Sequence, residues 1–192
     1  IDTRHAEVAR AACRAGATIV NDVSASLDHV AADTGAAWIA MHKRGEPATM
    51  QDNPRYGDVV AEVAAELTEV AERAHRRGVD EVWVDPGIGF GKTFADNWRL
   101  LAHLDVLVAT GFPVAVGTSR KGFLGAALAH AGGRDGAGRA VPTDDRLVGS
   151  VTTGLWAATM GVTMIRVHDV AETVAALDAA GLRPTRTVAV GG

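Results

Sequence analysis

Short runs of β-branched and aromatic residues alternate along the chain with longer, alanine-rich stretches whose apolar positions recur at helical spacing. The strand-like runs end in polar residues, and we expect them at 18–22, 37–42, 81–85, 112–120 and 163–168, with residues 1–2 as the end of another. The helical stretches are expected at 4–15, 27–34, 57–77, 94–109, 144–160 and 170–180. This alternation is typical of βα units around a parallel sheet.

The number of repeating units favours a barrel over an open sheet. A glycine follows each helical stretch, as expected for a C-terminal cap: Gly16, Gly35, Gly78, Gly111, Gly161 and Gly181. An eightfold (β/α) barrel needs roughly 31 residues per unit, so six units predict roughly 190 residues. The chain has 192. We therefore expect an α/β fold of the TIM-barrel type, as a single domain over residues 1–192 with about six of its eight units present. A doubly wound sheet is the alternative, but no strand carries its glycine fingerprint.

Composition narrows the possible functions. The chain is 47% hydrophobic with a formal net charge of −4, and its charges are mixed without a basic block, which argues against nucleic acid as a partner. The lone cysteine, Cys13, excludes an internal disulfide. No run of about 18 apolar residues occurs, so no membrane span is predicted. We expect a cytoplasmic protein.

The stretch VDPGIGFGKT at 84–93 resembles a phosphate-binding loop but fails both nucleotide fingerprints. The P-loop pattern would need a glycine at Pro86, and the dinucleotide pattern would need one at Lys92. We interpret Asp85, at the carboxyl end of a strand, as the working residue, with glycines that let a planar ligand approach the backbone. A turn aspartate before Pro86 is the plainer alternative. Lys92 is expected to serve the following helix.

The strand ends also carry two chemically different sets of polar residues. Asp2, Asn21 and Asp85 form a hydrogen-bonding set that suits an aminopyrimidine edge. A cationic set from the last two strands suits an anion, and two of its members share one side of a strand through their i, i+2 spacing. This set comprises Lys121, Arg166 and His168. The other polar residues at strand ends are Asp22, His42, Lys43, Arg44, Ser119 and Arg120.

Taken in order, the motifs IDT, NDVS, MHKRG, DPGIGFGKT, VGTSRKGFLG and RVHD resemble those of dihydropteroate synthase, a pterin-binding enzyme of folate biosynthesis. The resemblance implies a transferase that joins 6-hydroxymethyl-7,8-dihydropterin pyrophosphate to p-aminobenzoate and releases pyrophosphate. It also implies Mg²⁺ as a cofactor, sensitivity to sulfonamides and a homodimer.

The resemblance also implies roles for individual residues. Catalytic roles fall to Asp85, Lys121 and Asp2. The implied pterin-binding residues are Asp2, Asn21, Val23, Met41, Asp85, Phe90, Gly117 and Lys121. Arg166 and His168 would hold the pyrophosphate, and the p-aminobenzoate side would comprise Lys121, Arg120 and Gly122. Position 122 is often serine in the family.

Family members carry two further βα units before the IDT strand, with a metal-associated asparagine in their loops. We therefore expect the first two strands of the barrel to be missing, the chain to be part of a longer protein, and its activity alone to be poor. Two other functions stay open: a pterin-binding methyltransferase domain, for which the cationic set would have no purpose, and a non-catalytic paralogue. The Gly/Arg-rich segment 129–146 is expected to be a loop, either a lid or an inert insertion.

Overall fold

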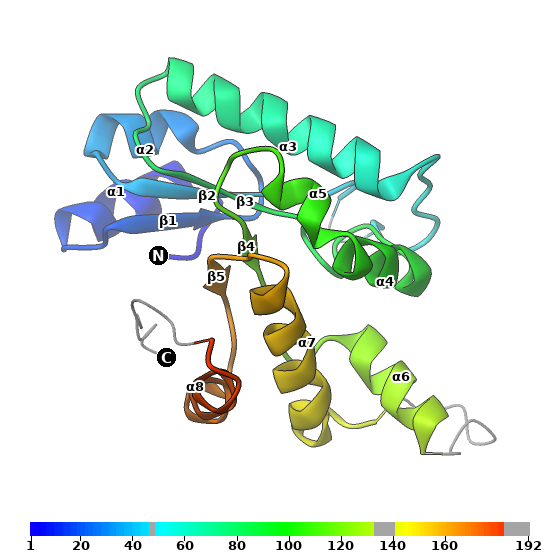
Figure 1. The fold of residues 1–192 in the computed structure, drawn as a ribbon. Helices are drawn as coiled ribbons and strands as arrows, with labels where there is room; N and C mark the ends of the chain where they lie inside the picture. The colour runs from blue at the N-terminus through cyan, green and yellow to red at the C-terminus, as the bar shows by residue number, and fades with distance from the viewer. Residues whose placement is uncertain (47–48, 133–140, 183–192) are drawn as a thin grey trace.

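The computed structural model describes residues 1–46, 49–132 and 141–182 of the chain (Figure 1). Three strands form a parallel sheet in chain order: β1 (Ile19–Asp22), β2 (Ala37–Met41) and β3 (Val82–Asp85). A second parallel pair joins β4 (Ala115–Val116) to β5 (Met164–Ile165). Isolated parallel bridges, Asp2 to Asn21 and Val84 to Val114, extend the order at both ends of the first sheet. The predicted α/β arrangement with parallel strands is confirmed, and the described strands do not close into a barrel.

The helices are α1 (Ala6–Arg14), α2 (Asp28–Thr34), α3 (Val59–Arg76), α4 (Phe94–Ala102), α5 (Leu104–Val108), α6 (Gly122–Ala131), α7 (Leu147–Thr159) and α8 (Val170–Ala179). Figure 1 shows α2 and α3 on the same side of the β1–β3 sheet, whereas α6, α7 and α8 gather beyond β4 and β5.

Helix α3 begins where the Asp58 carboxylate accepts the N–H groups of Val60 and Ala61. Its buried residues recur every three or four positions and so form one stripe along the helix.

Two helix predictions were wrong. The stretch 94–109 breaks at His103 into α4 and α5. Helix α6 was missed, because its sequence GFLGAALAHA contains two glycines and no side chain caps its first turn. The predicted loop 129–146 shrinks accordingly: 129–131 belong to α6, Thr143–Arg146 form a 3₁₀ turn, and 133–140 lie outside the described residues.

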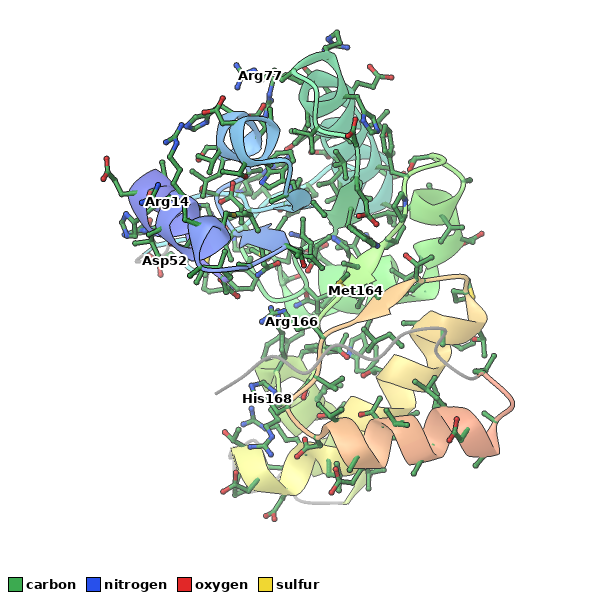
Figure 2. All side chains as sticks on the ribbon, turned by 90° about the vertical axis from the view of Figure 1, so that its left-hand side faces the viewer. Arg14, Asp52, Arg77, Met164, Arg166 and His168 are labelled. Atoms are coloured by element: carbon green, nitrogen blue, oxygen red, sulfur yellow. The ribbon has the colours of Figure 1, made fainter. Side chains whose placement is uncertain are left out.

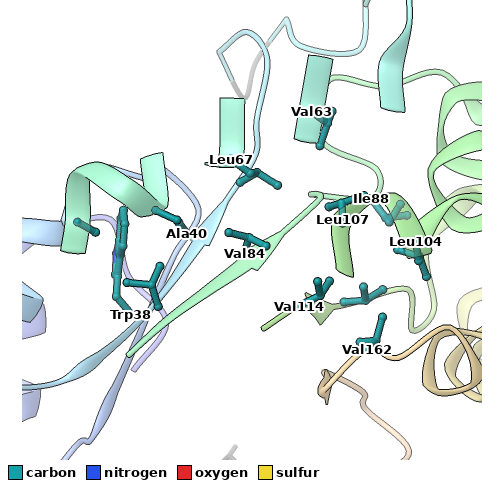
Figure 3. Close-up of a cluster of buried hydrophobic side chains, with 14 of the residues drawn as sticks. Trp38, Ala40, Val63, Leu67, Val84, Ile88, Leu104, Leu107, Val114 and Val162 are labelled. Atoms are coloured by element: carbon teal, nitrogen blue, oxygen red, sulfur yellow. The ribbon is translucent and has the colours of Figure 1, made fainter. Parts of the chain in front are cut away.

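Successive side chains along each strand point to opposite faces of the sheet. The residues facing the helices are almost fully buried: Val20, Trp38, Ala40, Val82, Val84, Val114 and Val116. They pack with α3 and α5 side chains into one hydrophobic core, part of which Figure 3 shows. Ile19, Asn21 and Trp83 point to the opposite face and are only half-buried. This opposite face, called the inner face below, carries most of the predicted site residues.

Core packing makes a direct prediction for helix α5. Leu107 is 0% exposed, whereas its neighbour Val106 is 39% exposed. Leu107→Ala leaves a cavity in the core shown in Figure 3 and should lower the free energy of unfolding by about 2–5 kcal/mol. Urea denaturation followed by circular dichroism measures the change. Val106→Ala is the matched control, with an expected loss of about 0.5 kcal/mol or less, and equal losses in the two variants would contradict the core assignment.

Candidate active site

The loop after β3 is forced into close contact with the loop after β2. Asp85, the last residue of β3, is 4% exposed and accepts the Gly87 N–H at 2.7 Å. Gly87 and Gly91 have positive φ angles, and a Cβ atom on them would lie 1.8 Å from the His42 carbonyl oxygen and 2.0 Å from that of Arg44. No side chain fits at those distances. These two glycines are therefore needed for backbone packing as well as for conformation.

Three side chains hold this loop in place. The Asn97 amide oxygen in α4 accepts the Gly89 N–H at 2.7 Å, and the Tyr56 hydroxyl donates to the Gly91 carbonyl at 2.8 Å. Lys92, which is 2% exposed, donates to carbonyl oxygens of the loop and to the ring of His42. The expectation that Lys92 serves the following helix is wrong, because its ammonium group is turned back into the loop.

Lys121 reaches the same loop from the start of α6. Its Nζ atom donates to the Ile88 carbonyl and lies 4.5 Å from the centre of the Phe90 ring. Burial lowers the pKa of Lys121 to about 8, while the nearby Asp85 carboxylate opposes this decrease. Burial also raises the pKa of Asp85, against the opposing effects of Lys121, the Gly87 N–H and Arg166. Asp85, Phe90 and Lys121 are thus brought together as predicted.

A second cluster forms at the first and last described strands. The Asn21 amide donates to the Asp2 carboxylate at 2.7 Å, and Arg166 Nη1 lies 3.7 Å from the same oxygen atom. Figure 2 shows Arg166 between the β1–β3 part of the molecule and the helices beyond β5. A Cβ atom at Gly117 would approach the Arg166 guanidinium to 3.2 Å, so glycine leaves room for this arginine. The heterocycle and anion sets therefore meet at Arg166.

His168 follows Arg166 along the chain, and both are labelled in Figure 2. Its ring Nδ1 lies 2.9 Å from the Ser119 hydroxyl, which also accepts the His168 backbone N–H at 3.2 Å. Ser119 is 6% exposed, so this contact fixes the ring from the buried side. The other ring nitrogen, Nε2, is not engaged by Ser119.

The Arg120 side chain points to two acidic residues, Asp169 and Asp144. Its guanidinium binds Asp169 through two hydrogen bonds of 2.5 and 3.2 Å and lies 3.5 Å from Asp144. The side chains of Arg120 and Lys121, both predicted on the p-aminobenzoate side, therefore have different partners, since Lys121 donates to the Ile88 carbonyl. Gly122 is the first residue of α6 and is exposed, and a Cβ atom there would meet no neighbour within 4 Å. A serine would fit in its place.

Three polar residues at strand ends have structural contacts. Asp22 is 0% exposed and accepts hydrogen bonds from Ser24, Ser26, Leu27 and Trp38, which shapes the turn after β1. Arg44 binds Glu62 and Glu66 of α3, and its guanidinium lies 4.1 Å from the centre of the Tyr56 ring. His42 is buried beside Lys92, and burial followed by the Lys92 charge lowers its pKa to about 4.

The predicted apolar wall residues differ in position. Met41 is 2% exposed and pairs in register with Asp85, whereas Val23 is half-buried in the turn after β1. A cavity of ≈ 230 Å³ lies between α3 and the loops after β1 and β2. Met41 lines it, but the other predicted pterin-binding residues do not. This cavity is therefore distinct from the cluster around Asp85 and Lys121.

Sequence reasoning missed Asn97 and Tyr56, which hold the loop. A signal for Asn97 was present: it shares the buried stripe of α4 with Leu100 and Leu101, and a polar residue on such a stripe needs a hydrogen-bond partner. Tyr56 lies in a segment without periodicity, so nothing marked it.

Within the described residues, no three His, Cys, Asp or Glu side chains group closely enough to hold a metal ion. No helix among the described residues is both long and apolar enough to cross a membrane.

Comparison with protein families identifies the chain's relatives. The family model described as "Pterin binding enzyme" matches residues 1–168. The chain belongs to this pterin-binding family. Among curated members, dihydropteroate synthase of Mycobacterium leprae is 46% identical over 189 residues, which cover 94% of this chain and 65% of the relative. The chain therefore spans less than two thirds of that relative's length. A second protein of the same organism, named inactive dihydropteroate synthase 2, is 39% identical over 204 residues and is covered to 66%.

Solved structures of the pterin-binding family agree with the fold. Dihydropteroate synthase from Thermus thermophilus has been determined in complex with 6HMPPP and, separately, with 4-aminobenzoate. Each structure has a TM-score of 0.83 and 42% identity to this chain, and covers 93% of it. The chain covers 69% and 67% of the two structures respectively.

The pairing of the Asp85 and Lys121 charges predicts a shift in the pKa of this lysine. Asp85→Asn removes the carboxylate charge that raises the pKa of Lys121, so that pKa should fall below about 8. NMR titration of ¹³C-labelled lysine side chains measures it, and assignment is simple because the chain has three lysines. Asp80→Asn, an exposed aspartate at the opposite end of β3, is the control and should leave the Lys121 titration unchanged. An unchanged pKa in Asp85→Asn would show that the two groups do not interact.

Proposed function

We propose that the chain is part of a dihydropteroate synthase, which joins 6-hydroxymethyl-7,8-dihydropterin pyrophosphate to p-aminobenzoate with release of pyrophosphate. The observation that carries the proposal is the grouping of two carboxylates with two cations at the inner face. Asp85 is close enough to Lys121 and Arg166 for both to influence its pKa, and Arg166 also contacts Asp2. Family membership and the identity to the M. leprae synthase support the same activity.

The fold of the intact protein is part of the proposal. The described strands follow one another in parallel and in chain order, which suits consecutive units of an eightfold barrel of the TIM type. The M. leprae synthase is longer than this chain, and two βα units before residue 1 would complete eight. We infer that these units form the first two strands, beside the Asp2 bridge and β5.

In this reaction the carboxylates act on the pterin and the cations on the leaving group. Asp85 accepts one backbone N–H and is otherwise placed to accept hydrogen bonds from the amino and ring N–H groups of a pterin. Its position at a strand end places it at the mouth of the proposed barrel. A Cβ atom at Gly89 would lie 3.2 Å from the Lys121 side chain, whose ammonium group lies 4.5 Å from the centre of the Phe90 ring, so this glycine leaves room for Lys121 beside Phe90.

Bond breaking then separates charge. The C–O bond to pyrophosphate breaks with its electron pair on the leaving group, and positive charge develops on the pterin methylene. Asp85 and Asp2 stabilise that positive charge, while Arg166 and His168 stabilise the pyrophosphate. The p-aminobenzoate nitrogen forms the new C–N bond and afterwards loses a proton. No protein nucleophile is required.

The same proposal includes Mg²⁺ as a cofactor, a homodimer and a cytoplasmic location. Only the resemblance to the family supports these three points. The described residues do not fit a metal site, because no three suitable ligands group together among them. The carboxylates Asp2 and Asp85 are each already engaged by a cation or an N–H donor.

Two other functions are tested by the same residues. A methyltransferase domain would have no use for the cationic set, yet Lys121 and Arg166 are close enough to Asp85 to influence its pKa. A non-catalytic role has a specific observation in its favour, since the inactive relative from M. leprae is also similar to this chain. A measurement of substrate turnover separates the synthase from the methyltransferase and from the non-catalytic role.

The intact protein containing these residues should convert dihydropterin pyrophosphate and p-aminobenzoate to dihydropteroate and pyrophosphate. Asp85→Asn should reduce kcat/KM by about 100-fold or more, because electrostatic stabilisation at a reacting centre is worth about 3 kcal/mol. Product formation measured by chromatography checks both statements. Asp80→Asn should turn over normally, and a wild-type protein that binds pterin without turnover would favour the non-catalytic role.

The 192-residue chain by itself should be poorly active. Its Asp2 and Arg166 side chains are 52% and 43% exposed, so the charges at one end of the site are screened by water. Steady turnover by the purified chain, measured by the same chromatographic assay, would contradict this expectation.

A further inference from the structure

Lys92 has the contacts of a group that fixes the loop after β3, and the proposed reaction gives it no chemical step. Its Nζ atom lies 2.9 Å from His42 Nδ1, 3.1 Å from the Gly87 carbonyl oxygen and 3.1 Å from that of Phe90. An ammonium group has three N–H donors and no acceptor, so each donor has one partner here. The Nδ1 atom of His42 then accepts, which places the ring hydrogen on Nε2.

The hydrogen-bond partners of Lys92 lie at both ends of the loop that follows Asp85 and at the end of the neighbouring strand β2. Gly87, whose N–H donates to Asp85, is held through its carbonyl oxygen, and Phe90, which lies under Lys121, is held in the same way. His42 comes from the neighbouring strand end, where its own carbonyl would touch any Cβ at Gly87. Lys92 thus ties the two ends of the pterin-facing loop to each other and to β2.

We propose that Lys92 is a positioning residue for pterin binding: with His42, it holds the loop 85–91 so that Asp85 and Phe90 face the ring. The proposal rests on the proposed function for the identity of the ligand, but the loop contacts are independent of it. Burial of the pair excludes direct contact of Lys92 with a ligand from solvent, since Lys92 is 2% and His42 4% exposed. The effect of Lys92 on the site therefore passes through the backbone of the loop.

Lys92→Met keeps an unbranched apolar chain as long as that of lysine without its terminal nitrogen, and so removes the three donors. Binding of dihydropterin pyrophosphate to the intact protein, measured by calorimetry, should weaken about tenfold or more, corresponding to about 1.4 kcal/mol. Hydrogen exchange of peptides covering 85–91 should speed up in the same variant, because two loop carbonyls lose their donor. Arg77→Met is the matched control: it removes a cation 2.8 Å from the buried Asp28 carboxylate on α2 and should change neither measurement.

The outcomes separate positioning from general stability. Lys92→Met protein that folds, binds pterin as wild type does and exchanges at the wild-type rate would overturn the proposal. If Lys92→Met lacks a cooperative melting transition, the pterin affinities of two His42 variants test the proposal in its place. His42→Asn retains an acceptor at the Nδ1 position and should bind pterin within about twofold of wild type, whereas His42→Leu should bind about tenfold more weakly. Equal affinities in these two variants would overturn the proposal.

The test also distinguishes failure of the proposed function. If wild-type protein does not bind dihydropterin pyrophosphate, the proposed function is contradicted, while the exchange measurement still decides whether Lys92 fixes the loop. Faster exchange confined to 85–91 supports loop fixing, and exchange that rises equally throughout the protein contradicts it.

Discussion

The site depends on the close passage of two backbone segments, the loop after β3 and the loop after β2. At Gly87 and Gly91 there is no space for even one carbon atom beyond the backbone, because carbonyl oxygens of the neighbouring loop occupy it. This packing places the Gly87 N–H against Asp85 and leaves the loop carbonyls facing inward, where Lys92 and Tyr56 donate to them. A glycine-rich loop that looks flexible in the sequence is therefore tightly constrained in the fold.

Much of the fold could be predicted because the strands and helices are local in origin. The alternation of short apolar runs with amphipathic stretches placed the strands β1–β3 and the helix α3 to within a few residues, and glycine caps marked the helix ends. Prediction failed where the local signal was weak. Helix α6 is rich in glycine and alanine and is stabilised by packing of Phe123 and Leu124 in the core, which no local rule indicates.

For the site, residue types at strand ends were enough to predict which side chains come together, but not which of them are structural. Asp22 and Asp85 both end parallel strands and both are buried. Asp22 points towards the helices, where several backbone N–H groups and a tryptophan donate to it, whereas Asp85 accepts one N–H and lies near three cations, Lys121, Arg166 and Lys92. The number of hydrogen bonds each carboxylate accepts depends on the three-dimensional turn that follows it. That number, and not the residue type, separates a structural carboxylate from a chemically available one.

Arg166 decides how the two halves of the site work together. The sequence suggested a separate heterocycle end and anion end, yet Arg166 contacts Asp2 and also influences the pKa of Asp85. A cation shared between two carboxylates is held in place without a ligand. In the proposed reaction, pyrophosphate would replace one carboxylate partner of Arg166, and Asp2 would then be available to the pterin. Because the carboxylates and Arg166 would stabilise charges of opposite sign, this arginine would link the two ends of the proposed site through a single side chain. Gly117 lies beside this guanidinium: a Cβ atom there would lie 3.2 Å from it, so a larger residue would require Arg166 to shift by a few tenths of an ångström and would disturb the charge that it shares between Asp2 and Asp85.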